Sequence, residues 1–167
     1  MNIIFFADSV TMLLDLDRLI SKKINVVWVV YHDLVYKELI KNGIERDRIE
    51  FIDLTFPYLK NPTIIKKILK RIWCSFLKED TLQYSLHITI KKFNKKYNPK
   101  LWITDTSSLL SGVDIASPKV TTLHSVTYKR FYLDRCNLKY DVIFFPGSYH
   151  KKRFEKFHSD FDFSKKR

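Results

Sequence analysis

A histidine followed by cationic side chains comes directly after a buried strand pattern in the C-terminal half of the sequence. His124 follows the apolar run at residues 120–123, and Lys129 and Arg130 come shortly after it. An imidazole titrates near neutral pH, so it can take a proton from a hydroxyl group. Lysine and arginine hold phosphate through charge-assisted hydrogen bonds. The spacing predicts a proton acceptor beside a phosphate-binding group. The alternative is a strand-end histidine that only hydrogen-bonds a backbone carbonyl.

Polar side chains also follow three other apolar runs. They are Asp8 and Ser9 after residues 2–7, His32 after residues 24–31, and Asp105 after residues 101–104. The carboxyl ends of parallel strands meet at one edge of a sheet, which is where open α/β sheets bind ligands. These four residues are therefore candidates to line a cleft. Capping of the following helix is the competing role, and we expect it to be the commoner one.

Apolar runs that alternate with helical periodicity define the expected fold. Strands are expected at residues 2–7, 24–31, 49–54, 101–104, 120–123 and 139–145. Helices are expected at residues 10–20, 34–41, 63–78, 81–97, 109–116 and 149–157. Asp33 is expected to cap the second helix and Gly43 to end it. The order predicts an α/β, Rossmann-like, doubly wound and mainly parallel sheet of about six strands.

The composition excludes several classes of protein. Of the 167 residues, 46% are hydrophobic and only three are glycine, so one sizeable core is expected but no glycine-rich phosphate loop. The two cysteines show no metal-ligand spacing. The sequence shows neither a secretory-signal pattern nor an apolar run of about 20 residues for a membrane span. We therefore expect a cytoplasmic protein without a cofactor or a metal.

The formal net charge of +12 is concentrated in two segments. Residues 60–100 contribute +9 and residues 147–167 contribute +4. Within the first segment, the apolar stripe of the helix expected at residues 63–78 should pack against the core. The alternative is an interfacial helix that lays its cations on anionic lipid. Its membrane-facing residues would be Lys66, Lys67, Lys70, Arg71 and Trp73.

Two motifs resemble the CDP-glycerol glycerophosphotransferase family, whose members polymerise teichoic-acid and related capsule backbones. His124-Ser125-Val126-Thr127-Tyr128-Lys129 is similar to the family's HG(T)xxK signature, with Ser125 where the family usually has glycine. Residues 140–149 (YDVIFFPGSY) resemble its strand-and-turn motif, and a basic helix follows. The resemblance covers residues 99–158 at the level of motifs. Residues 1–98 match only the general Rossmann pattern.

The resemblance implies one half of a two-domain GT-B transferase of cell-wall or capsule synthesis. Residues 1–158 would be the acceptor-side domain, with a basic helical segment at 62–97, and residues 159–167 would begin a linker to a nucleotide-binding domain outside this sequence. His124 would be the general base on the acceptor hydroxyl. The acceptor's phosphate would be held by Ser125, Thr127, Lys129 and Arg130. The implied partners are a lipid-linked polymer acceptor, a nucleotide-activated donor and the anionic inner face of the cell membrane.

Two other classes of function remain open from the sequence. A nucleic-acid-binding module would use the basic segment with its aromatic residues as a phosphate-tracking surface. We consider nucleic acid unlikely as a partner, because those aromatic residues fall mostly on apolar helix faces and no nucleic-acid-binding motif is present. The third class is a catalytically silent regulatory domain of the same fold.

Overall fold

The computed structural model describes residues 1–52, 68, 72, 81–105, 110–123, 133 and 135–165. Its strands are β1 (Asn2–Ala7), β2 (Asn25–Val30), β3 (Ile49–Phe51), β4 (Leu101–Thr104), β5 (Lys119–Thr122) and β6 (Val142–Phe144). Its α-helices are α1 (Thr11–Ile20), α2 (Asp33–Lys41), α4 (Thr81–Tyr97) and α6 (Ser148–Phe157). Short 3-10 helices are η1 (Arg46–Arg48), η3 (Arg135–Lys139) and η4 (Phe163–Lys165).

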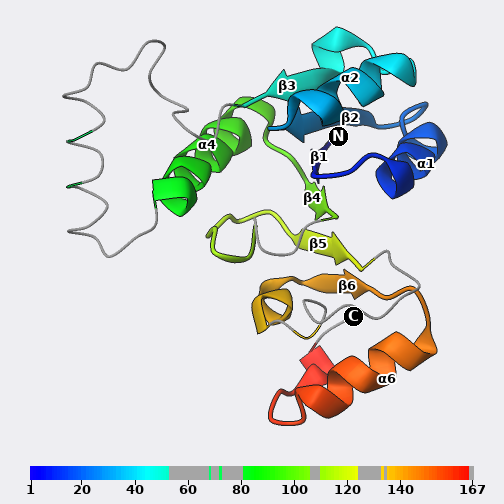
Figure 1. Cartoon of the computed structure of the whole chain (residues 1–167), viewed down its shortest axis with the longest axis vertical. Coiled ribbons are helices and arrows are strands. Elements are labelled where there is room, and N and C mark those ends of the chain that lie inside the picture. Colours follow the sequence, from blue (N-terminus) through cyan, green and yellow to red (C-terminus); the bar gives the residue numbers. More distant parts are fainter. Residues whose placement is uncertain are drawn as a thin grey trace.

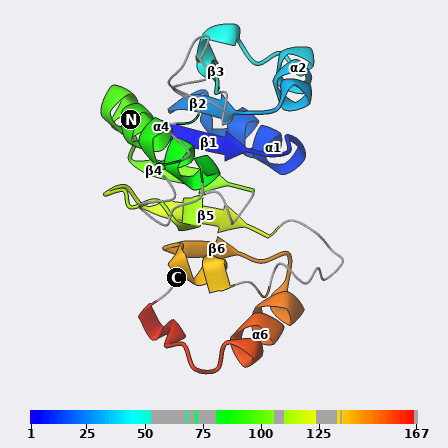
Figure 2. The ribbon, with the colours of Figure 1, turned by 60° about the vertical axis from the view of Figure 1, so that its left-hand side comes forward.

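The six strands form one sheet in the order β3-β2-β1-β4-β5-β6, and every pairing is parallel (Figures 1 and 2). This confirms the predicted Rossmann-like α/β fold. The chain first builds outward from β1 to β3 and then returns to add β4 on the other side of β1. The strand order therefore reverses between β1 and β4, and such a reversal leaves a crevice beyond the carboxyl ends of the strands.

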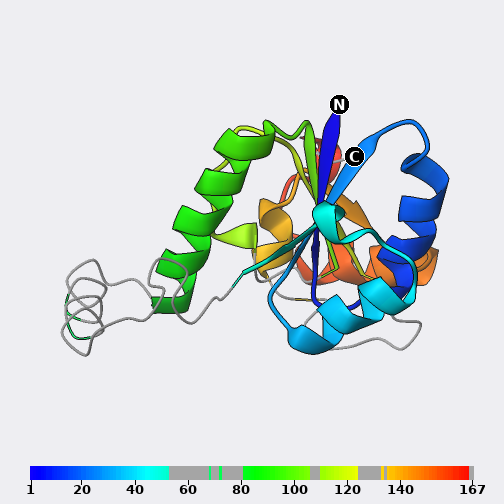
Figure 3. The same ribbon diagram turned by 90° about the horizontal axis from the view of Figure 1, so that it is seen from above.

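Helices cover both faces of the sheet, with α1 and α2 on one face and α4 on the other (Figure 3). Successive side chains of β1 point to opposite faces of the sheet, which explains the two layers. Phe5 packs into the layer with α1 and α2, whereas Ile4 and Phe6 pack into the layer with α4. Because both faces are covered, the central strands read as continuous apolar runs.

Most of the expected elements are confirmed, three of them at their predicted bounds. Strands β1 and β4 have the predicted limits, and α4 covers residues 81–97 as expected, with Leu86 and Ile90 fully buried. Gly43 follows α2 with a φ of +82°, the left-handed conformation that favours glycine at a helix end. The predicted cap of α2 is wrong, because the helix begins at Asp33 itself and His32 occupies the N-cap position without a capping side chain.

The helix expected at residues 109–116 is wrong over its second half. Leu110 and Ser111 are helical, but residues 113–115 are not. Gly112, a poor helix former, follows Ser111. The carbonyl of Val113 then accepts a hydrogen bond from Lys119 Nζ at 3.0 Å. The chain thus turns back to enter β5.

The segment at residues 63–78 lies outside the described residues except for Ile68 and Ile72. Both are helical, and both are exposed, by 51% and 60%. For these two residues the expected core packing is wrong, because apolar periodicity defines a helix face but not what covers it. Lys66, Lys67, Lys70, Arg71 and Trp73 lie outside the described residues. In the described ranges, no helix combines the length and apolarity needed to cross a bilayer.

Part of the basic charge of α4 is structural. Glu50 in β3 accepts hydrogen bonds from Lys96 Nζ and from the Tyr97 hydroxyl in the last turn of α4. Burial alone would raise the pKa of Glu50, but these two hydrogen bonds, together with the positive charges of Lys96 and Lys92, hold its pKa below the usual value. The carboxylate therefore fastens the basic end of α4 to the edge of the sheet.

The segment after α6 packs back onto the domain, although the sequence shows no pattern for it. The ring of Phe163 lies 5.9 Å from that of Phe154 in α6, and Asp160 pairs with Arg135 at 2.9 Å. Phe154 is buried, so it joins α6 to the segment that follows it.

Candidate functional site

The carboxyl ends of three adjacent strands bring five polar residues together. They are Asp8 and Ser9 after β1, Tyr31 and His32 after β2, and Asp105 after β4. The register of the sheet explains the arrangement, because Ala7 pairs with Val30 and Phe6 with Thr104. The residues that follow these pairs therefore reach the same edge. We call these five residues the edge cluster, and it lies at the reversal of strand order where open α/β sheets bind ligands.

Asp105 joins the end of β4 to the turn between β1 and α1. Its Oδ1 accepts a hydrogen bond from the backbone N–H of Asp8 at 2.9 Å. Its Oδ2 accepts from the backbone N–H and from the hydroxyl of Ser9, both at 2.7 Å. The side chain is almost fully buried, with 7% of the residue exposed. Three hydrogen bonds to a carboxylate at this depth fix the turn in place.

The expected capping roles of Asp8 and Ser9 are wrong. The N-cap of α1 is Val10, and no side chain caps that helix. The Ser9 hydroxyl donates to Asp105 instead. A carboxylate from a neighbouring strand offers a charge-assisted bond, which is stronger than a bond between neutral groups.

Asp8 connects the end of β1 to the end of β2. The hydroxyl of Tyr31 donates a hydrogen bond to Asp8 Oδ1 at 2.6 Å, and His32 Nε2 lies 3.5 Å from the same oxygen. Burial, and then the bond to Asp8, raise the pKa of Tyr31, with a further contribution from Asp105. The phenol therefore stays protonated and acts as a donor to the carboxylate.

The Asp8–His32 pair is open to solvent and has the composition of an acid–base pair. The side chain of His32 is 56% exposed and that of Asp8 is 43% exposed. A carboxylate beside an imidazole orients the ring. The ring of Tyr31 lies 4.2 Å from that of His32 and limits how the imidazole can turn. The arrangement can hold a hydroxyl group and accept its proton.

The structure brings together all four cleft candidates and adds a fifth residue. Sequence reasoning treated Tyr31 only as the last residue of an apolar strand. Its hydroxyl at a strand end was the signal that could have identified it. Among the described residues, no three His, Cys, Asp or Glu side chains are grouped so that they could hold a metal ion.

The residues predicted to hold and deprotonate the acceptor lie outside the described residues. They are His124, Ser125, Thr127, Lys129 and Arg130. The strand before them, β5, pairs with β4 in parallel, and buried Leu123 comes directly before His124 in the sequence. The described part of β5 therefore ends at the edge that carries the cluster.

No protein-family model matches this chain, and a search of curated proteins finds no significant match. The function is therefore inferred from the fold, from the geometry of the edge cluster and from the two motifs.

Replacing Asp105 with asparagine is expected to lower the free energy of unfolding by about 1–3 kcal/mol. An amide has one acceptor oxygen and a donor group, and that donor would face the N–H groups of Asp8 or Ser9. Urea denaturation measures the loss, and amide hydrogen exchange at Asp8 and Ser9 should become faster. The control is Asp33→Asn, which removes an exposed carboxylate paired with Lys37 at 2.8 Å. Equal stability losses in the two variants would contradict the role of Asp105.

Proposed function

We propose that this chain is the acceptor-side domain of a transferase of the glycosyltransferase or glycerophosphotransferase type that acts on cell-wall or capsule polymers. In this proposal, an acceptor hydroxyl binds beyond the carboxyl ends of β1, β2, β4 and β5. The observation that carries the proposal is the edge cluster, a polar and partly exposed group at the reversal of strand order. The two motifs around β5 and β6 are the reason for proposing a transferase as the class of enzyme.

The contacts of Asp105 favour an acceptor role over a nucleotide-binding role for this domain. Dinucleotide-binding Rossmann domains offer the backbone N–H groups of the first strand–helix turn to a pyrophosphate. Here the N–H groups of Asp8 and Ser9 already donate to the carboxylate of Asp105. A second anion at this turn would meet that negative charge. The proposal therefore places the activated donor in a separate nucleotide-binding domain.

The roles follow from the chemistry of the side chains. His124 is proposed as the general base, as the resemblance implies, and Lys129 and Arg130 as the groups that hold the acceptor's phosphate. The pair of Asp8 and His32 positions the acceptor hydroxyl. The base removes the proton of that hydroxyl while its oxygen attacks the donor's phosphorus, or the anomeric carbon of a sugar donor. The bond from that atom to the nucleotide's phosphate oxygen breaks, and the nucleotide leaves. The basic segment at residues 60–100 is proposed to keep the domain beside a lipid-linked acceptor at an anionic membrane.

Binding of glycerol 3-phosphate tests the acceptor site. We expect nuclear magnetic resonance titration to shift the amide signals of Asp8, Ser9 and His32. The double variant Lys129→Gln/Arg130→Gln should weaken binding at these signals by about tenfold. The double variant Lys22→Gln/Lys23→Gln removes the same charge from the exposed turn after α1 and should leave binding within about twofold of the original. Equal weakening in both variants, or an absence of shifts at this edge, would refute the acceptor site.

Transfer activity tests the assignment of the base. In a two-domain enzyme that carries this chain, His124→Gln should lower kcat by about 10²–10⁴-fold while glycerol 3-phosphate still binds. His32→Gln should have the smaller effect on kcat. The reverse result would give the base role to His32. Turnover of CDP-glycerol by these 167 residues alone would contradict the need for a separate donor domain.

A further inference from the structure

The helix α6 carries a cationic and aromatic face that the proposed transfer reaction does not use. Tyr149, Lys152, Arg153 and Lys156 recur at helical spacing, and Phe157 follows them. Residues at this spacing share one side of a helix. The buried residues of α6, His150 and Phe154, anchor its other side to the domain. This face lies at the β6 end of the sheet, away from β1 and β2 (Figures 1 and 2).

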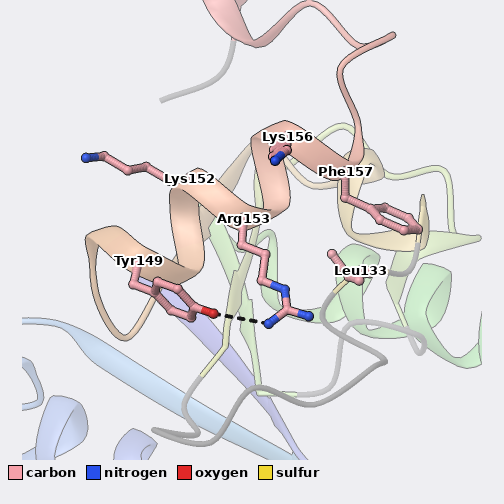
Figure 4. Close-up of a pocket in the computed structure, with 6 residues that line it drawn as sticks. All are labelled: Leu133, Tyr149, Lys152, Arg153, Lys156 and Phe157. Carbon is pink, nitrogen blue, oxygen red and sulfur yellow. Dashed lines mark hydrogen bonds between the residues drawn. The ribbon is translucent and has the colours of Figure 1, made fainter.

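A pocket of about 670 Å³ lies against this face. Its lining residues are Leu133, Tyr149, Lys152, Arg153, Lys156 and Phe157 (Figure 4). This volume is in the usual range for small-molecule sites, about 300–1,000 Å³. Tyr149 and Phe157 are each 61% exposed, which is a large apolar surface for a helix of ten residues. Two exposed rings in a hollow offer surfaces on which a ring or an apolar group can pack.

Two of the cations that line the pocket have no acidic partner in the part of the chain that the structure describes. Among the described lining residues, none is a carboxylate. Lys151, which lies outside the lining, faces Glu155 at 3.9 Å, whereas Lys152 and Lys156 form no ion pair with any residue in the described ranges. Such a group of cations favours an anion, and a phosphate group suits it.

Arg153 is held in an orientation that suits a phosphate. Its Nη1 donates a hydrogen bond to the hydroxyl of Tyr149 at 3.1 Å, one helical turn away (Figure 4). The guanidinium is therefore positioned within the pocket. A guanidinium keeps several donors in a fixed plane, which matches the oxygens of a phosphate.

We propose that the α6 pocket binds a phosphate ester, with the phosphate on Lys152, Arg153 and Lys156 and the organic part against Tyr149 and Phe157. The same chemistry is offered by a soluble phosphorylated metabolite and by the headgroup of an anionic phospholipid. The site stands apart from the acceptor site of the proposed function, because it uses residues of α6 and none of the edge cluster.

Phenyl phosphate is the probe that combines the two required parts. Titration followed by nuclear magnetic resonance should shift the amide signals of residues 149–157. Inorganic phosphate alone should bind about tenfold more weakly, because it lacks the ring that packs on Tyr149 and Phe157. The double variant Lys152→Gln/Lys156→Gln should weaken binding of phenyl phosphate by about tenfold or more. The matched control Lys22→Gln/Lys23→Gln should change it by less than about twofold.

Sedimentation with vesicles separates the two sources of the phosphate. Binding to phosphatidylglycerol vesicles that Lys152→Gln/Lys156→Gln weakens, and that the control variant retains, would support the site with a lipid headgroup as its ligand. Binding of phenyl phosphate, with vesicle binding that is absent or that Lys152→Gln/Lys156→Gln leaves unchanged, would support the site with a soluble ester as its ligand. Equal effects of the two double variants, or shifts that spare residues 149–157, would overturn the proposal. The acceptor site is judged separately, on the amide signals of Asp8, Ser9 and His32.

Discussion

Replacing Arg48 with methionine is expected to lower the free energy of unfolding by about 3–5 kcal/mol. Arg48 pairs with Asp17 of α1, and its Nε donates to the backbone carbonyl of Val26 at 3.1 Å. The side chain of Asp17 is only 3% exposed and that of Arg48 is 21% exposed. Methionine fills a similar volume without charge, so a carboxylate would remain buried without its cation. Urea denaturation of the variant and of the unchanged chain measures the difference.

The same substitution at Arg18 is the matched control. Arg18 lies next to Asp17 in α1 and pairs with Asp15 at 3.3 Å, but these side chains are 62% and 74% exposed. An exposed pair contributes about 0–1 kcal/mol, so Arg18→Met should be nearly neutral. Adding Asp17→Asn to Arg48→Met should recover part of the loss, because the buried charge is then removed. Similar losses at the two arginines would show that burial of the pair does not matter.

The fold was predictable because the central strands have a distinctive apolar composition in the sequence. Residues 2–7 and 24–31 are short, continuous apolar runs, which are typical of strands covered on both faces. The helices between them have a period near 3.6, and Gly43 marks the end of one at a positive φ. These are local signals. A right-handed parallel crossover follows from them with few alternatives.

Two expectations were wrong, namely the second half of the helix at residues 109–116 and the core packing of Ile68 and Ile72. The segment after Ser111 leaves the helical path as Val113 accepts a bond from Lys119. Ile68 and Ile72 fit an apolar stripe but are exposed. Periodicity records which side chains share a face, and it carries no information about which partner covers that face.

The candidate site was predictable in position and less so in chemistry. Asp8, Ser9, His32 and Asp105 each follow a strand, and parallel strands must bring such residues to one edge. The competing role of Asp8 and Ser9 as helix caps could be dismissed only from the contacts. Asp105 accepts hydrogen bonds from two backbone N–H groups. Almost every residue has such a group, so the sequence carries no signal for these contacts. The proposal of an acceptor over a nucleotide at this turn therefore rests on geometry and not on the sequence.

Replacing either buried tryptophan with alanine is expected to lower the free energy of unfolding by about 3–5 kcal/mol, which urea denaturation measures. Trp28 and Trp102 are both fully buried, and they lie in the packing layers on opposite faces of the sheet. Trp28 contacts the ring of Phe5 edge-on at 5.1 Å. Each alanine variant removes a large ring from a core that cannot collapse around the gap.

Phenylalanine at the same two positions separates packing from hydrogen bonding. Trp102 Nε1 donates to the side-chain oxygen of Asn94 at 3.3 Å, whereas Trp28 Nε1 has no hydrogen-bond partner within the described part of the chain. A net hydrogen bond contributes about 1 kcal/mol, and a buried donor without a partner is itself unfavourable. Trp102→Phe should therefore cost about 1 kcal/mol more than Trp28→Phe. A larger loss at Trp28 would mean that cavity volume, and not the indole N–H, decides the stability of this core.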